Sequence, residues 1–215
     1  PLDRETALLE KQAKVNQLIN MHRVRGHLIA DLDPLQVKEP KMHPELDPAT
    51  YGLTIWDLDR EFLTGSDSGI YAQVGGQNRM PLGDLLGVLR DAYCRTVGVE
   101  YMHIQDPVEK RWMQEQLEGA DRSIEPDEQR HILGRLNAAE ALETFLGTKY
   151  VGQKRFSLEG AESLIPLLDE VLTDAAHDDI LEVAIGMPHR GRLNVLTNIA
   201  GKSYAQVFRE FEGDY

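Results

Sequence analysis

The chain has 215 residues, and its 23 Lys and Arg against 36 Asp and Glu give a formal net charge of −13 at pH 7. This charge argues against nonspecific nucleic-acid binding, which needs clustered positive charge to neutralise phosphates. A local basic pocket for a small anion remains compatible with it. The apolar fraction of 41% is enough for a core, in one or two domains or in part of a larger one.

The single cysteine, Cys94, rules out an internal disulfide and a metal site built from several cysteines. We interpret it as a small buried hydrophobe and predict a reducing, cytoplasmic location. No apolar stretch approaches the ~20 residues of a membrane span and no signal peptide is visible, so no membrane association is expected. Because the chain begins at Pro1 and stops without a closing element, we expect it to be part of a longer protein.

Residues 1–148 are predicted to form a mainly helical region. Apolar residues recur at helical spacing over residues 3–34, where Gly26 is a weak point and Pro34 ends the helix. Asp106 is expected to cap a helix that begins at Pro107. The other expected elements are helices at 54–63, 81–97 and 126–147, turn-rich loops at 37–52 and 64–79, and a strand at 97–104.

The stretch "MHRVRGH", residues 21–27, gathers two histidines and two arginines. His22 and His27 are five residues apart, so they do not share a helix face well and a metal pair is not expected. We predict a structural or subunit-contact role for this stretch.

Residues 149–215 are predicted to hold an incomplete first βαβ unit of a parallel sheet. "RFSL" (155–158) is expected to be a strand, residues 160–177 a helix, and the apolar run "DILEVAIG" (179–186) a buried parallel strand. Ligands of such sheets bind outside the carboxyl ends of the strands. The segments "FSLEG" and "GMPHRGR", which follow the two strands, are therefore expected to meet at one edge.

The second of these segments opens a predicted helix, 193–200, whose free backbone N–H groups carry a partial positive charge. Arg190 and Arg192 add forked donors suited to carboxylate or phosphate, and His189 can exchange a proton near neutral pH. The pattern predicts an anion site with an acid–base group beside it. The alternative is that His189 caps the helix and the arginines pair with acids such as Glu182 or Asp179.

The first segment is less informative when its residues are considered alone. Its simplest interpretation is that Phe156 is a core aromatic, Ser157 a turn hydroxyl and Glu159 a surface acid. No phosphate-binding glycine motif, HExxH or GxSxG occurs in the chain.

Four long blocks resemble, in the same order, the thiamine-diphosphate-dependent E1 component of 2-oxoglutarate dehydrogenase. The resemblance covers nearly the whole chain and is closest to the actinobacterial form, in which an acyltransferase-like segment precedes the E1 part. The blocks are "LINMHRVRGHLIADLDPL" (18–35), "EYMHIQDPVEKRWMQEQLE" (100–118), "GQKRFSLEGAESLIPLLDEVL" (152–172) and "GMPHRGRLNVLTNIAGK" (186–202).

The resemblance implies an α/β thiamine-diphosphate-binding fold preceded by a helical region, with thiamine diphosphate and Mg²⁺ as cofactors. It implies decarboxylation of 2-oxoglutarate and transfer of a succinyl unit to a lipoyl group. It places His189 in the substrate pocket as a catalytic and substrate-binding residue, and Arg190 near both cofactor and substrate. Phe156 would face the reacting centre and contact substrate.

The implied partners are 2-oxoglutarate, a lipoyl-bearing acyltransferase component, a dihydrolipoamide dehydrogenase component and a second copy in a homodimer. The metal-binding GDG motif and the cofactor-activating glutamate of this family have no counterpart here, so both are expected outside the chain. Two alternatives stay open. One is a non-catalytic module that docks partner chains and binds a phosphate, and the other is a related thiamine-diphosphate enzyme acting on pyruvate or a sugar phosphate.

Overall fold

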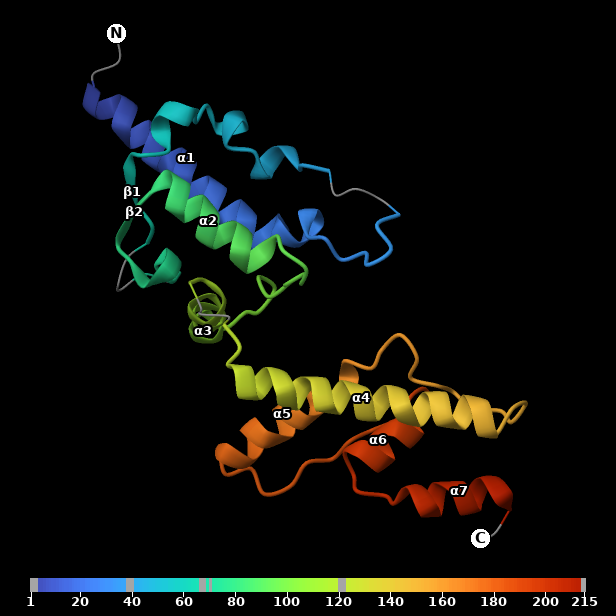
Figure 1. Cartoon of the computed structure of the whole chain (residues 1–215). Helices are drawn as coiled ribbons and strands as arrows, with labels where there is room; N and C mark the ends of the chain where they lie inside the picture. The colour runs from blue at the N-terminus through green and yellow to red at the C-terminus, as the bar shows by residue number, and fades with distance from the viewer. Residues whose placement is uncertain (1–3, 38–40, 66–68, 70, 120–122, 214–215) are drawn as a thin grey trace. The chain divides into compact units, whose positions relative to one another are not determined.

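The computed structural model describes residues 4–37, 41–65, 69, 71–119 and 123–213. The chain forms two compact units, Pro1–Arg122 and Ser123–Tyr215, and each is mostly helical (Figure 1). The helix Pro126–Lys149 belongs to the second unit. Among the described helices, none combines the length and apolarity that a membrane crossing requires.

The core of the first unit lies between α1 (Arg4–Arg25) and α2 (Leu82–Tyr93), which lie side by side (Figure 1). The apolar stripes of the two helices supply most of its buried side chains, among them Val15, Leu18, Ile19, Leu82, Leu85 and Leu89. α1 ends earlier than predicted, and a 3₁₀ turn, η1 (Gly26–Ile29), follows it. A Cβ at Gly26 would lie 2.4 Å from Cβ of Tyr93, so only glycine permits this close approach to α2.

The only sheet among the described residues is a short antiparallel pair, β1 (Glu61–Leu63) and β2 (Arg79–Pro81), with Phe62 opposite Met80. The helix predicted at 54–63 is therefore wrong beyond its first turn, η4 (Ile55–Asp57). Pairing with β2 explains the difference. The Gln12 amide of α1 also exchanges two 2.9 Å hydrogen bonds with the Leu63 backbone.

The two predicted loops contain short 3₁₀ turns. These turns are η2 (Pro44–Leu46), η3 (Pro48–Tyr51) and η5 (Val74–Gly76). Residues 38–40, 66–68 and 70 of these loops lie outside the described residues.

The third helix of this unit, α3 (Pro107–Leu117), begins as predicted, because Asp106 Oδ1 accepts a 2.7 Å hydrogen bond from the Val108 N–H. The strand predicted at 97–104 is wrong, since this segment has irregular backbone. Its alternation of apolar residues reflects local burial instead. Tyr101 is buried, and its ring stacks against that of Tyr93.

A buried ion pair joins α1 to the end of α3. The Arg23 guanidinium donates to both carboxylate oxygens of Glu118, at 2.7 and 2.8 Å, and to the Ala72 carbonyl at 2.9 Å. Glu118 also accepts a 2.7 Å hydrogen bond from the Tyr93 hydroxyl. Burial alone would lower the pKa of Arg23, but the Glu118 carboxylate more than offsets this and raises it. The structural role predicted for residues 21–27 is thus confirmed for Arg23.

The second unit is built on α4 (Pro126–Lys149), with α5 (Leu164–His177) and α6 (Arg192–Asn198) packed against it. One small core cluster consists of Ala139, Leu158, Ile165 and Val195, and Leu142, Leu146 and Val207 are buried as well. α7 (Tyr204–Glu212) was not predicted, although Ser203 and Gln206 form a capping box at its start.

The βαβ unit predicted for residues 149–215 is wrong in its strands, because the described part of this unit contains no strand. Residues 155–158 and 180–187 are irregular, and the second stretch is not buried. Leu181, for example, is 94% exposed. The physical reason is that a strand requires a neighbour to pair with, and no described segment of this unit lies alongside residues 180–187 in a backbone ladder.

Cys94 lies at the end of α2 and is partly buried, and burial raises the pKa of its thiol to about 11. Since only the thiolate attacks alkylating reagents, we expect Cys94 to react with iodoacetamide at pH 8 about 100-fold more slowly than a free thiol of pKa 9. Denaturant should remove this difference. Rapid alkylation of the native chain at the free-thiol rate would contradict the burial of Cys94.

Candidate functional site

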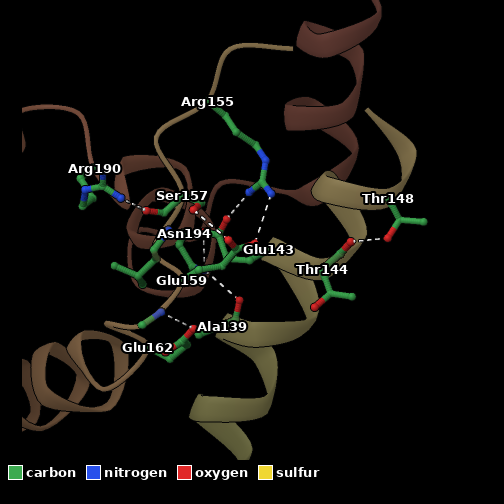
Figure 2. A network of polar contacts seen from close by, with 12 residues as sticks. Ala139, Glu143, Thr144, Thr148, Arg155, Ser157, Glu159, Glu162, Arg190 and Asn194 are labelled. Atoms are coloured by element: carbon green, nitrogen blue, oxygen red, sulfur yellow. Dashed lines mark hydrogen bonds and ion pairs between the residues drawn. The ribbon is translucent and has the colours of Figure 1, made fainter. Parts of the chain in front are cut away.

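The segments 156–160 and 186–192 meet beside α4. The Gly191 N–H donates a 3.0 Å hydrogen bond to the Phe156 carbonyl. Arg190 Nη1 donates a hydrogen bond of 3.0 Å to the Ser157 carbonyl (Figure 2). The centroids of the Phe156 and His189 rings are 4.3 Å apart, with an interplanar angle of 46°. The expected meeting of "FSLEG" and "GMPHRGR" is thus confirmed, although no strands deliver them.

The side chains of this cluster face solvent. Phe156 is 56% exposed, so its interpretation as a core aromatic is wrong. His189 and Arg190 are exposed as well, and within the described part of the chain neither side chain forms an ion pair. The three predicted site residues therefore present an aromatic ring, an imidazole and a guanidinium on one surface.

The turn before α6 contradicts the alternative in which His189 caps the helix. Gly191, in the left-handed conformation, occupies the N-cap position, and no side chain caps the helix. Among the described residues, neither Arg190 nor Arg192 pairs with Glu182 or Asp179. α6 has only seven residues, so its dipole adds little to the charge that Arg190 supplies.

Gly191→Ala is expected to destabilise the second unit more than a glycine substitution in open space. Gly191 has φ +72°, and its added Cβ would lie 2.5 Å from Cδ1 of the buried Leu158. The positive φ alone costs about 1–3 kcal/mol for alanine. The overlap with Leu158 adds a term of about the same size.

Gly201→Ala is the matched control, because Gly201 has φ +74° and nothing within 4 Å of its added Cβ. Urea unfolding gives the free energy of unfolding of both variants. The difference between their losses is the cost of the overlap with Leu158. Equal losses in the two variants would show that Leu158 does not hold the turn.

Glu143 of α4 holds the backbone and side chains next to this cluster by hydrogen bonds, although no sequence motif marks it. Its carboxylate, on α4, accepts hydrogen bonds from Arg155 Nη1, from the Leu158 N–H at 3.1 Å and from Asn194 Nδ2 at 3.1 Å (Figure 2). One signal could have revealed it. Glu143 falls on the same helix stripe as Ala139, Leu142 and Leu146, and an acid there must be buried.

The donors of this surface suit an organic anion and not a metal ion. Arg190 uses one of its guanidinium N–H groups on Ser157, which leaves others for a carboxylate or a phosphate. The described residues contain no group of three or more His, Cys, Asp or Glu side chains that could hold a metal ion.

No family model matches the chain, but comparison with known proteins finds relatives that are more than 50% identical to it. The chain is 52% identical over 215 residues to the multifunctional 2-oxoglutarate metabolism enzyme of Mycolicibacterium vanbaalenii, a match that covers 99% of this chain and 17% of that protein. It is 54% identical over 214 residues to the enzyme of the same name from Mycobacterium sp. strain JLS, covering 99% of this chain and 16% of that enzyme. It is 53% identical over 209 residues to the 2-oxoglutarate dehydrogenase E1/E2 component of Corynebacterium glutamicum, covering 95% and 16%.

These identities define the chain as homologous to a segment of enzymes of 2-oxoglutarate metabolism. Among these relatives are multifunctional 2-oxoglutarate metabolism enzymes and an E1/E2 component, which confirms the resemblance found in the four sequence blocks. The chain spans 16–17% of the length of these curated relatives.

Proposed function

We propose that the chain supplies one wall of the substrate pocket of a thiamine-diphosphate-dependent E1 enzyme that decarboxylates 2-oxoglutarate. The observation that carries this proposal is the contact of Phe156 with His189, beside Arg190, in a chain more than 50% identical to 2-oxoglutarate enzymes. The three side chains come from the two blocks that the family resemblance assigns to the site.

Arg190 binds an anionic group of the ligand in this proposal. 2-Oxoglutarate carries two carboxylates, and a guanidinium offers forked donors that match a carboxylate. The bond from Arg190 to the Ser157 carbonyl restricts the guanidinium, so that less side-chain freedom is lost when an anion binds. Its permanent charge also suits the diphosphate of the cofactor.

His189 supplies a directional hydrogen bond to the keto oxygen or the adjacent carboxylate of the substrate. The Phe156 ring lies against its imidazole, covers part of it from water and restricts its orientation. A positioned imidazole can donate or accept a proton as charge moves on the substrate.

Thiamine diphosphate, when bound, supplies the electron sink that allows the carboxylate to leave as CO₂. The exposed guanidinium of Arg190 fits an anionic cofactor group. In this proposal the Mg²⁺ ligands and the activating glutamate would come from polypeptide outside this chain. The remaining polypeptide would also supply the strands of the parallel sheet. The exposed apolar run at residues 180–185 is suited to pair with such strands.

The partners proposed for the whole protein are a lipoyl-bearing acyltransferase, which accepts the succinyl unit, a dihydrolipoamide dehydrogenase and a second copy of the protein. The Corynebacterium glutamicum relative carries E1 and E2 in its name. This name supports an acyltransferase partner for the present chain, in the same polypeptide or in a complex.

The proposal is tested by CO₂ release from 2-oxoglutarate in the full-length protein with thiamine diphosphate and Mg²⁺. Pyruvate lacks the distal carboxylate, so the kcat/KM for pyruvate should be about 10–150-fold lower than that for 2-oxoglutarate. This is the range expected for losing one hydrogen bond to a charged group. The 215-residue chain by itself should release no CO₂. Preference for pyruvate would favour the related-enzyme alternative, and bound cofactor without any turnover would favour the non-catalytic module.

A further inference from the structure

The Glu143 carboxylate is buried, and both of its oxygens accept hydrogen bonds. The Glu143 side chain is 4% exposed, and Arg155, paired with it, is 15% exposed. Oε1 accepts from the Leu158 N–H and from Asn194 Nδ2, while Oε2 accepts from Arg155 Nη1. A carboxylate at such depth is costly unless it is paired and fully hydrogen-bonded, so this arrangement is strongly specified by its partners.

Each partner of Glu143 lies within, or next to, one of the two site segments. Arg155 and Leu158 flank Phe156, so their bonds hold the loop on both sides of that ring. Asn194 lies in α6, directly after the turn that carries His189, and its amide also donates to the Ala139 carbonyl of α4 at 2.9 Å. One buried carboxylate thus ties both segments to the same turn of α4 (Figure 2).

We propose that Glu143 is the positioning residue of the site, which sets the Phe156 loop and the His189 turn in register. The catalytic meaning of this inference rests on the proposed function, but the clamp itself does not. The Gly191–Phe156 bond and the packing of Leu158 beneath Gly191 join the segments directly, and Glu143 anchors them to α4.

The chemistry of the three donors predicts how substitutions behave. Glu143→Gln keeps the size but turns one acceptor oxygen into an NH₂ group, which then faces another donor, and it removes the charge opposite Arg155. Glu143→Asp keeps the charge and both acceptors but is one methylene shorter. Glu140→Gln is the matched control, because Glu140 is an exposed residue of the same helix.

The test is hydrogen exchange measured by mass spectrometry in the full-length protein. In Glu143→Gln, the Leu158 amide loses its bond to a charged group and should exchange about 10–150-fold faster. The Gly191 amide, which donates to the Phe156 carbonyl, should also exchange faster because the Phe156 loop is released from α4. Peptides from α5 should keep the wild-type rate, and Glu140→Gln should change neither region. Glu143→Asp should restore part of the protection.

The kinetics of the same variants should show whether Glu143 positions the site residues or only stabilises the unit. Glu143→Gln is expected to lower kcat for 2-oxoglutarate decarboxylation by about 10-fold or more, while the Kd of thiamine diphosphate changes by less than about 3-fold. Glu143→Asp should recover part of kcat. A parallel loss of kcat and cofactor binding, with faster exchange throughout the unit, would reduce Glu143 to a structural residue and overturn the proposal.

Two further arms keep the proposal testable. If Glu143→Gln does not fold, Arg155→Lys leaves the Leu158 and Asn194 bonds in place, and it should give a smaller increase in exchange at residues 156–158. Wild-type exchange there would overturn the clamp. If the wild-type protein releases no CO₂ from 2-oxoglutarate, the proposed function fails, and the exchange data still decide whether Glu143 holds the two segments.

Discussion

Replacing His189 by alanine in the full-length protein is expected to lower the rate of 2-oxoglutarate decarboxylation by about 10²–10⁴-fold, as for a positioned acid–base group. Binding of thiamine diphosphate should change little, because the contribution of the imidazole is a directional hydrogen bond to the substrate. Single-turnover CO₂ release and cofactor affinity are measured separately. His177→Ala, an exposed histidine at the end of α5, is the control and should behave as wild type.

Arg190→Ala should weaken ligand binding more than it slows the chemical step, which is the reverse of the effect expected for His189→Ala. Losing one hydrogen bond to a charged group weakens ligand binding by about 10–150-fold, because a guanidinium supplies permanent charge. The exposed Arg130, which pairs with Asp127, provides the control substitution. If His189→Ala loses cofactor while its bound fraction reacts at the parent rate, the two roles are reversed. If neither variant changes either quantity, the "HRGR" segment is only a helix start.

Glu118→Gln is expected to destabilise the first unit by about 3–5 kcal/mol, because it leaves the Arg23 guanidinium buried and uncompensated. The side chains of Arg23 and Glu118 are 4% and 0% exposed, so water cannot replace the lost carboxylate oxygen. The Tyr93 hydroxyl also loses a charged acceptor. Urea unfolding followed by the fluorescence of Trp56 and Trp112, both in this unit, reports the change.

Glu115→Gln is the matched control for this prediction. It makes the same chemical change in α3, but the ion pair of Glu115 with Arg111 lies at the surface, with side chains 48% and 33% exposed. Exposed pairs of this kind contribute about 0.3–0.5 kcal/mol in helices. Losses of equal size in the two variants would mean that the Arg23–Glu118 pair is hydrated in solution.

The helices could be predicted because their signals are local. Asp106 and Pro107 mark the start of α3, and Pro126 marks that of α4, through caps and fixed dihedrals within one turn. The strands expected at 97–104, 155–158 and 179–186 are absent from the described structure, because apolar alternation does not contain the partner that a strand must pair with. β1 was missed for the same reason, since β2 decides its conformation.

The candidate site, too, could be predicted only in part from the sequence. The proximity of Phe156 and His189 was predicted from two parallel strands whose carboxyl ends share an edge, and the residues do meet, although those strands are absent from the described structure. The family resemblance identified Phe156 where its residue type alone suggested core. Glu143 could not be assigned a partner from sequence. Its contacts with Leu158 and Asn194 span 15 and 51 residues, and a helical glutamate carries no mark of what it will meet.

The exposed apolar run at residues 180–185 has a consequence for the behaviour of this chain in solution. An exposed hydrophobic stretch rich in β-branched residues, which forms no backbone ladder with any other described segment, is a template for pairing between copies, as in the association of sheet edges. The net charge of −13 opposes such association by mutual repulsion. This repulsion fades as added salt shortens the Debye length to ~10 Å at 0.1 M. The colloidal stability of the chain therefore depends on ionic strength until another polypeptide segment covers residues 180–185.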